Sequence, residues 1–346
     1  MRLTSVVMAA LLASGAFAGV ACGQASDSSA QGQAVAAGSP LIGMPAPRVE
    51  LATIDGESID LGVLYGKKAV YLKFWATWCI PCRRQMPHFE NAYRTAGADL
   101  AVIAVNVGMN DPLEDVRRFR DEYGIHMPIV VDDGRLAAAL NLQITPQHVV
   151  IGRDGRIRYV GHLADEALDA TLVEARSIAA PAIRRREGAV REIARYRVGD
   201  RLPGLAGTTI DGEIFAARTS GESRPTVLVF FSPWCETYLA GSRPEVGARC
   251  RQAREQVDAL ARERTDVRWL GVASGLWAVE RDLVDYRAMY GTSIPLMLDE
   301  SGEWFRAFDV RDVPAVLLAD SDGRLVHRGD GYDTEWPSVL ERLGGR

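Results

Sequence analysis

The chain has 346 residues, of which 47% are apolar and 25% charged, so it is long enough for two folded domains with separate cores. Its formal net charge of −5 excludes the strong basic excess that is typical of nucleic-acid-binding proteins. Beyond the N-terminus, no stretch of the sequence is apolar enough to cross a bilayer.

The N-terminal residues have the pattern of an export signal, which we predict over residues 1–22. Arg2 precedes an apolar stretch over 5–21, and small residues lead up to Cys22. This end resembles a bacterial lipobox, in which the cysteine is lipidated, although Gly19 replaces the usual leucine-like residue. Cleavage after Ala18 is the alternative, and it would leave a soluble protein.

Residues 23–39 are rich in Gly, Ser, Ala and Gln, and we interpret them as a flexible tether. With either kind of signal, we expect the protein in the periplasm or cell envelope, where disulfide chemistry is routine. The only membrane contact that we expect is a lipid at Cys22.

From residue 40 the sequence alternates between predicted strands and helices. Apolar runs predict strands at 49–53, 70–75, 100–107, 129–131, 148–151 and 157–160. Charge and apolar spacing predict helices at 83–95, 112–123 and 135–140. Because the pattern closes in a hairpin at Asp154-Gly155, we predict an α/β domain over 40–165, with a mixed central sheet flanked by helices.

Two cysteines lie where the strand over 70–75 meets a helix, in the sequence Trp78-Cys79-Ile80-Pro81-Cys82. Free N–H groups at a helix start stabilise a thiolate, so Cys79 is the expected nucleophile. Cys82 lies one turn further along, within reach of a mixed disulfide on Cys79. Pro81 restricts the backbone between them.

The spacing of this cysteine pair also fits two other interpretations. Half of a structural zinc site would need two more ligands, but the other cysteines lie far away and lack that spacing. Two inert buried thiols are the second alternative. We interpret the pair as a dithiol-disulfide site, with no metal and no cofactor.

The second half of the chain repeats the first. We predict a closing helix over 164–180, which overlaps a helical linker over 166–197 that contains a charged run at 184–188. Thr209–Glu213 repeats Thr53–Glu57, and Trp234-Cys235 repeats Trp78-Cys79, both at an offset of 156 positions. Asp322-Gly323 repeats Asp154-Gly155, and Pro314 repeats Pro146, both at an offset of 168 positions. The offset has grown from 156 to 168, so the second copy has 12 extra residues in between. These repeats predict a second domain over 198–346, with an insertion around 241–264.

The first unit resembles the thioredoxin superfamily, and specifically its TlpA-like extracytoplasmic thiol-disulfide oxidoreductases. The resemblance is carried by the run 73–82 and by Thr145-Pro146. It implies a cis proline at Pro146, beside the cysteines, where it keeps metal ions off the dithiol. It also implies that a substrate chain pairs with the backbone of Thr145. Trp78 and Pro81 belong to the same substrate-binding surface.

Two positions depart from the family pattern. Many relatives have a carboxylate six residues before the first cysteine, or a glutamate three after the second, but this chain has Lys73 and Gln85. Lys73 could act as a base if burial lowers its pKa. We favour the alternative, in which its amine reaches solvent. The proton acceptor therefore has no assigned residue.

The second unit resembles the same fold without the dithiol, so that the fold class is two tandem thioredoxin-like domains. It keeps Cys235 but has Tyr238 where the second cysteine should be, and Val313-Pro314 preserves the expected cis proline. Ser232 lies three residues before Cys235, as in peroxiredoxins, but Leu228 replaces their proline. The unit is either a binding domain or one whose cysteine pairs elsewhere.

We predict that Cys235 and Cys250 form a disulfide. An unbroken helix over 235–250 would hold the two residues roughly 22 Å apart, whereas a bridge needs Cα atoms within about 7 Å. Gly241, Pro244 and Gly247 interrupt that stretch, so the chain can fold back after a short turn near Leu239. The alternative is two separate thiols.

These observations predict an enzyme that exchanges disulfides with protein partners through Cys79 and Cys82. The family resemblance implies a reductant fed by a membrane electron donor, and no prosthetic group or nucleic acid is involved. Two alternatives stay open. One is a binding or chaperone module for apocytochrome or copper delivery, and the other is a thiol peroxidase.

Overall fold

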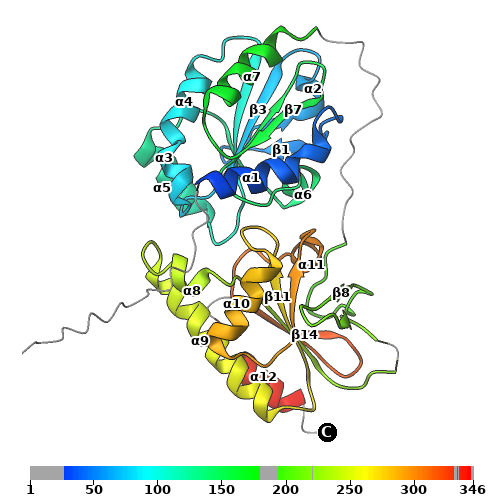
Figure 1. Ribbon diagram of the computed structural model, residues 1–346. Helices are drawn as coiled ribbons and strands as arrows, with labels where there is room; N and C mark the ends of the chain where they lie inside the picture. Colours follow the sequence, from blue (N-terminus) through cyan, green and yellow to red (C-terminus); the bar gives the residue numbers. More distant parts are fainter. Residues whose placement is uncertain (1–26, 180–193, 220, 331–332, 334, 344–346) are drawn as a thin grey trace, which may run out of the picture.

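The computed structural model describes residues 27–179, 194–219, 221–330, 333 and 335–343. They form two α/β domains that lie one above the other in Figure 1, joined in sequence by 180–193. The predicted export signal, with the lipidation candidate Cys22, lies outside the described residues, and so does the charged run at 184–188.

A five-stranded mixed sheet forms the centre of the first domain. Its strand order is β5 (Ile129–Val131), β4 (Leu100–Asn106), β3 (Ala69–Trp75), β6 (Gln147–Ile151) and β7 (Ile157–Gly161). Strands β3, β4 and β5 run parallel, whereas β6 and β7 pair antiparallel. Every residue of β3 is buried, because helices or loops cover both faces of this central strand.

Alternate side chains of β3 enter two different cores. Val70, Leu72 and Phe74 pack with side chains of α2 (Leu61–Leu64), α6 (Arg135–Ala139) and the β1–β2 hairpin (Glu50–Ala52, Ser58–Asp60). Tyr71 and Trp75 pack on the opposite face, against α3 (Ile80–Arg84), α4 (Met86–Arg94), α5 (Leu113–Tyr123) and α7 (Glu166–Ser177). In place of the single helix predicted over 83–95, the structure has two helices, α3 and α4, which meet at Gln85.

Helix α7 lies within the closing helix predicted over 164–180, and it belongs to the first domain rather than to the helical linker predicted over 166–197. Leu168, Leu172 and Ala175 are buried in the core beneath β3. The helix is capped by Asp165, whose carboxylate accepts a hydrogen bond from Leu168 N. An amphipathic stretch at the end of a domain can either pack on its core or form a linker to the next domain. The burial of these three side chains shows that this stretch packs on the core.

The flexible tether predicted over 23–39 is wrong for its described part. Asp27–Gly38 forms helix α1, followed by a short 3₁₀ turn at Ser39–Leu41. Ala30 and Ala34 are buried, and Gly38 lies directly against Val160 of β7. The small residues that suggested a linker allow close packing instead. Alanine favours a helix, and its small side chain lets the helix backbone approach the sheet.

The second domain repeats this architecture. Its sheet has the order β12 (Leu296–Asp299), β11 (Arg268–Ser274), β10 (Thr226–Phe231), β13 (Ala315–Ala319) and β14 (Leu325–Asp330), with the same strand directions. A hairpin of β8 (Ala206–Thr208) and β9 (Ile214–Ala216) corresponds to β1–β2. The predicted fold class, two α/β domains each with a mixed sheet flanked by helices, is confirmed.

The helices of the second domain explain the predicted insertion. They are α8 (Cys235–Tyr238), α9 (Pro244–Glu263), α10 (Glu280–Tyr290), α11 (Glu303–Ala307) and α12 (Trp336–Leu343). Helix α9 has 20 residues where α4 has 9, so the extra length lies in this helix. The short α8 ends at Tyr238, before the chain turns back, as the glycine and proline positions predicted.

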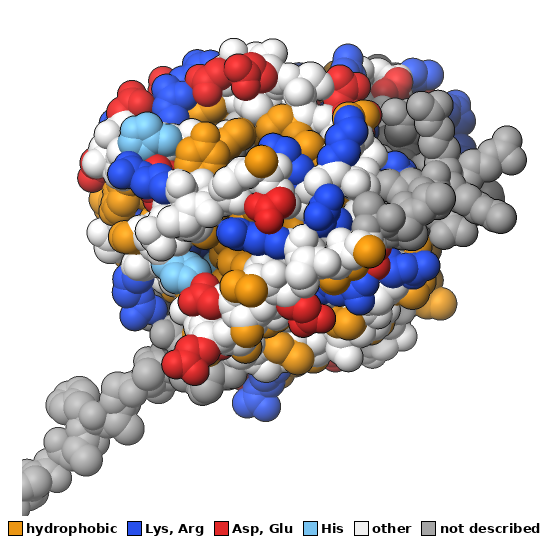
Figure 2. All heavy atoms as spheres, turned by 90° about the horizontal axis from the view of Figure 1, so that it is seen from above, with side chains coloured by type: hydrophobic (Ala, Val, Ile, Leu, Met, Phe, Trp, Pro, Cys, Tyr) orange, Lys and Arg blue, Asp and Glu red, His pale blue; other side chains and the backbone are white. Residues whose placement is uncertain are grey.

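The outer face of the first domain, opposite the second domain, carries both signs of charge. Figure 2 shows its acidic and basic side chains interspersed, with hydrophobic side chains scattered between them. Among the side chains that the structure describes on this face, there is no continuous basic stripe that would suit a phosphate backbone. Within the described residues, no helix combines the length and the apolar character that a membrane span requires.

The contact between α1 and β7 gives a stability test. A Cβ atom at Gly38 would overlap the side chain of Val160, whereas a Cβ at Gly32 of the same helix would meet no atom within 4 Å. Gly38→Ala should lower the free energy of unfolding by about 1–3 kcal/mol through overpacking. Gly32→Ala should raise it by about 0.5–1 kcal/mol through helix propensity.

Urea denaturation of both variants and the wild type measures the difference, and hydrogen exchange of the α1 amides locates it. A Gly38→Ala protein at least as stable as the wild type, with unchanged α1 protection, would show that α1 does not pack against β7.

Candidate active site

The turn after β3 carries Trp78 and the two cysteines. Cys79 is the N-cap of α3, and its Sγ accepts a hydrogen bond from Cys82 N at 3.2 Å. Pro81 lies in the first turn of this helix, where its missing N–H costs nothing. The indole N–H of Trp78 donates to Met109 O at 2.9 Å, which fixes the ring on the loop after β4.

Cys79 and Cys82 form a disulfide with a Cα–Cα distance of 5.2 Å. Cys79 is 2% exposed and Cys82 is fully buried. Because the N–H of Cys82 points at Cys79 Sγ, a thiolate released on Cys79 would find a hydrogen-bond donor already in place. This arrangement favours Cys79 over Cys82 as the stabilised thiolate.

Thr145 and Pro146 lie beside this disulfide. The bond between them is cis, as the family resemblance implied, and the Thr145 hydroxyl donates to Cys79 Sγ at 3.4 Å. The structure therefore brings together the predicted site residues Cys79, Cys82 and Thr145, with Pro146 following directly. A second donor on the same sulfur adds to the stabilisation of a Cys79 thiolate.

Lys73 is buried, and the expectation that its amine reaches solvent is wrong. The residue is 0% exposed on β3, and its Nζ lies 3.5 Å from Cys82 O and 5.3 Å from the centre of the Phe89 ring. Burial lowers the pKa of Lys73 from 10.5 to about 7. The side chain cannot reach solvent because Lys73 points into the core between β3 and α4 rather than toward the sheet edge.

A chain of polar groups continues from Lys73 beneath the disulfide. His148 pairs with Lys73 in the sheet register, and its ring nitrogens lie 2.7 Å from Tyr71 Oη and 2.7 Å from Gln85 Oε1. Burial, followed by the nearby Lys73 charge, holds the pKa of His148 well below its usual range. Gln85 Nε2 in turn donates to His162 O at 3.1 Å. Gln85, at the position of the family glutamate, thus orients a neutral histidine.

Side chains of the second domain cover Trp78. The ring centres of Trp234, Tyr238 and Trp277 lie 5.3, 6.2 and 4.8 Å from that of Trp78. The hydroxyl of Tyr238 accepts a hydrogen bond from Ile80 N at 3.2 Å, at the start of α3. Tyr238, which occupies the position of the missing second cysteine, is therefore a contact residue between the domains.

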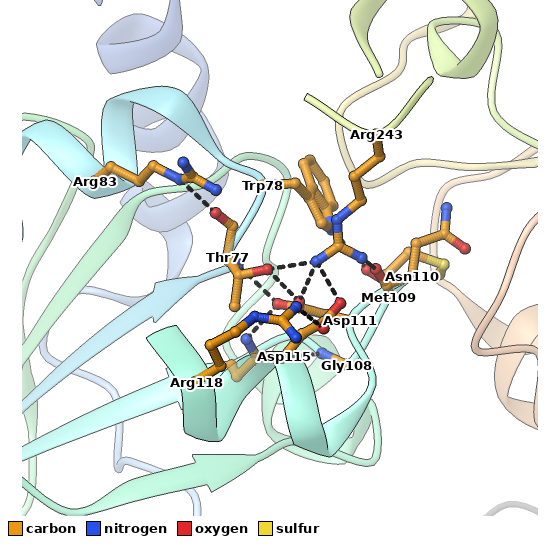
Figure 3. A network of polar contacts seen from close by, with 11 residues as sticks. Thr77, Trp78, Arg83, Gly108, Met109, Asn110, Asp111, Asp115, Arg118 and Arg243 are labelled. Carbon is orange, nitrogen blue, oxygen red and sulfur yellow. Dashed lines mark hydrogen bonds and ion pairs between the residues drawn. The ribbon is translucent and has the colours of Figure 1, made fainter. Parts of the chain in front are cut away.

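Arg243 of the second domain reaches the turn that holds Trp78, as Figure 3 shows. Its Nη2 donates to Thr77 Oγ1 at 2.6 Å and to Asp111 Oδ1 at 3.0 Å, and lies 3.1 Å from Asp115 Oδ2. Asp111 also accepts from Thr77 N at 2.7 Å. Burial raises the pKa of Asp111, and these hydrogen bonds and the Arg243 charge oppose the increase.

Cys235 and Cys250 form a second disulfide, as predicted, with a Cα–Cα distance of 6.2 Å. Cys235 begins α8 and Cys250 lies in α9. Cys250 Sγ lies 3.9 Å from Val313 O, in the residue before Pro314, and the Val313–Pro314 bond is cis. The second disulfide therefore lies beside the second cis proline, as Cys79–Cys82 lies beside the first.

Several contributors to the site were not found from the sequence. His148, a polar residue inside an apolar strand as Lys73 is, was a usable signal, because a buried polar side chain needs a partner. No pattern pointed to Trp277 or Arg243, which lie in loops of the other domain. Among the described residues, no group of three or more His, Cys, Asp or Glu side chains could hold a metal ion.

The chain is similar in sequence to several known proteins. The AhpC/TSA family profile matches residues 42–160. The chain is 41% identical over 111 residues to the thiol-disulfide oxidoreductase ResA of Halalkalibacterium halodurans. The aligned region covers 31% of this chain and 60% of that protein. The chain is 36% identical over 133 residues to the thioredoxin-like protein YneN of Bacillus subtilis, covering 38% of this chain and 78% of that protein.

ResA of Bacillus thuringiensis is 30% identical over 135 residues, covering 38% of this chain and 76% of that protein. Among solved structures, a thiol-disulfide isomerase from Corynebacterium glutamicum is 26% identical, with 38% of this chain and 97% of that chain covered and a TM-score of 0.35. The chain thus spans less than two thirds of the Halalkalibacterium relative, but more than three quarters of YneN and of the Bacillus thuringiensis ResA. On these identities, the chain belongs to the thioredoxin-like thiol-disulfide oxidoreductases.

Proposed function

We propose that this protein reduces disulfides of protein partners in the cell envelope, with Cys79 as the nucleophile and Cys82 as the resolving cysteine. The observation that carries the proposal is the convergence of two hydrogen-bond donors, Cys82 N and Thr145 Oγ1, on Cys79 Sγ. A sulfur held by two donors is the better thiolate, and thiolates are the attacking species in disulfide exchange.

The reaction has two exchange steps. The Cys79 thiolate attacks one sulfur of the partner's disulfide, which forms a mixed disulfide and releases the partner's other sulfur as a thiolate. The Cys82 thiolate then attacks Cys79 Sγ and releases the partner's remaining sulfur. The partner gains two electrons and two protons, and the protein is left with the Cys79–Cys82 disulfide. A membrane electron donor would restore the dithiol, and a lipid on Cys22 would keep the protein near that donor.

Lys73 is our candidate for the group that takes the proton of Cys82. Its amine lies against the Cys82 backbone, and burial brings its pKa to about 7, so it exchanges a proton readily near neutral pH. A lysine here reverses the charge of the carboxylate found in many relatives. A protonated Lys73 would favour a thiolate on Cys82, whereas a carboxylate would oppose it.

The cysteine roles predict different outcomes for two substitutions. The wild-type protein should catalyse the reduction of insulin disulfides, with dithiothreitol as the reductant. Cys79→Ala should abolish this catalysis, since the attacking thiolate is missing. Cys82→Ala should accumulate mixed disulfides with protein partners, because the resolving thiolate is missing. Turbidity of reduced insulin measures the first outcome, and non-reducing electrophoresis of Cys82→Ala measures the second. Full activity of Cys79→Ala would disprove its role.

The buried amine predicts a pH-dependent stability. Between pH about 7 and 10.5 the unfolded chain binds one more proton at Lys73 than the folded chain, so the free energy of unfolding rises with pH in this window. Below pH 7 both states are protonated, and the effect vanishes. Relative to Lys73→Met, which has no titrating group, wild-type stability should therefore gain about 2–3 kcal/mol from pH 7 to 9.

Urea denaturation of the oxidised proteins at several pH values checks this difference. All other titrating groups are shared by wild type and Lys73→Met. His148 feels the Lys73 charge, but burial is the larger cause of its lowered pKa, so it stays neutral above pH 7 in both proteins and cancels there with the rest. Parallel stability curves would show that Lys73 keeps an ordinary pKa in the folded protein.

A further inference from the structure

Equivalent loops of the two domains hold each other by backbone hydrogen bonds. The loop after β11 donates from Trp277 N to Gln143 O at 2.8 Å, and the loop after β4 donates from Asn110 N to Arg311 O at 2.9 Å. Gln143 and Arg311 each lie three residues before a cis proline. Each domain therefore places a loop on the cis-proline segment of the other.

The side chains of the two loops extend this mutual contact. Trp277 Nε1 donates to Thr145 Oγ1 at 2.9 Å, and Asn110 Oδ1 accepts from Val313 N at 2.8 Å. Trp277 and Asn110 both have positive φ angles, of 65° and 47°, a conformation that non-glycine residues seldom adopt. Asparagine tolerates this conformation, whereas for a bulky tryptophan it is a genuine outlier, so the backbone at Trp277 indicates that the docking is specific.

The contacted segment is the one that touches the reactive sulfur. Thr145 donates to Cys79 Sγ, so a protein that presents a disulfide to Cys79 approaches the surface on which Thr145 lies. The second domain already does so through Trp277. It is thus docked on the first domain at the surface that a disulfide substrate approaches.

The docked domain also carries a disulfide on the facing side. Trp234, the neighbour of Cys235, packs on Trp78, the neighbour of Cys79, and Tyr238 of α8 binds the start of α3. Both disulfides belong to one continuous cluster of buried side chains that spans the two domains. Cys235 is 0% exposed, as Cys82 is, whereas Cys250 is 8% exposed, so Cys235 is the more enclosed half of the second disulfide within this cluster.

We propose that the Cys235–Cys250 disulfide is a second redox couple, reduced within the chain by Cys79 and Cys82. This inference rests on the proposed function of the first pair. The Cys79 thiolate attacks Cys235 Sγ, a Cys79–Cys235 disulfide forms and Cys250 leaves as a thiolate. The Cys82 thiolate then attacks Cys79 Sγ and releases Cys235. Two electrons and two protons pass to the second pair, and the first pair becomes a disulfide.

Cys235 is the sulfur attacked because it begins α8, the helix that faces α3 across the aromatic contact. Cys250 lies on the longer α9, with its sulfur beside Val313 O. A structural staple between α8 and α9 would share this connectivity, but it would exchange no electrons with Cys79. The two roles therefore differ in kinetics and in the mixed disulfide formed.

The first test traps the intermediate in the full chain with Cys22→Ser. The Cys82→Ser/Cys250→Ser variant retains only Cys79 and Cys235, and most chains should form the bridge between them during mild oxidation. The matched control, Cys82→Ser/Cys235→Ser, retains Cys79 and Cys250 and should form at least tenfold less. Peptide mapping of non-reduced, alkylated monomer measures both. Equal yields, or no Cys79–Cys235 bridge, would overturn the assignment of Cys235.

The second test follows electron transfer with all four cysteines present. After limiting dithiothreitol, differential alkylation gives the rate at which Cys235–Cys250 is reduced in the wild type and in Cys79→Ser. We expect at least a tenfold slower reduction in Cys79→Ser, whereas equal rates would show a structural staple. Trp277→Asn, which suits the positive φ, should slow the transfer and speed insulin reduction by opening the surface at Thr145.

Insulin reduction by the same wild-type preparation separates two failures. A protein that reduces insulin but shows equal rates for the second disulfide contradicts only the internal couple. A protein that fails in both assays contradicts the proposed function itself.

Discussion

The buried carboxylate of Asp111 holds both the active-site turn and the second domain in place. It accepts hydrogen bonds from Thr77, Asn106 and Arg243, so its charge is shared between two domains. Removing one partner of a buried ion pair typically costs about 3–5 kcal/mol, because the remaining charge has no water to solvate it. The position of Trp78 and Cys79, which follow Thr77, therefore depends on a side chain that lies more than 160 positions later in the sequence.

The duplicated domains keep one feature in common and have diverged around it. Each places a disulfide beside a cis proline at the end of a buried central strand. In the second domain, Tyr238 replaces the nearby cysteine, and the partner cysteine has moved to a long α9. The replaced position became a docking contact, since Tyr238 now binds Ile80 N. Divergence at the second site and attachment of the two domains thus involve the same residues.

Lys73 changes the electrostatics of the first site without changing its shape. A buried amine costs free energy when charged, and this burial is what lowers the pKa of Lys73. The neighbouring histidine stays neutral for the same reason, because burial and the Lys73 charge both oppose its protonation. Burial raises the pKa of Tyr71. Among Lys73, His148 and Tyr71 beneath the disulfide, Lys73 is therefore the group that titrates near neutral pH.

By itself, the sequence determined the order of strands and helices, the duplication and the cysteine motif, because these depend on local patterns and fixed spacings. Both cis prolines were implied only by the family resemblance. The fold-back that joins Cys235 to Cys250 was also local, since Gly241 and Pro244 break the helix between them. Only the tertiary structure decided that Lys73 is buried, that Asp27–Gly38 packs as a helix on β7, and that Trp277 and Arg243 reach the first site. These outcomes depend on which surfaces meet, and contacts between residues so distant in sequence leave no periodic signal along the chain.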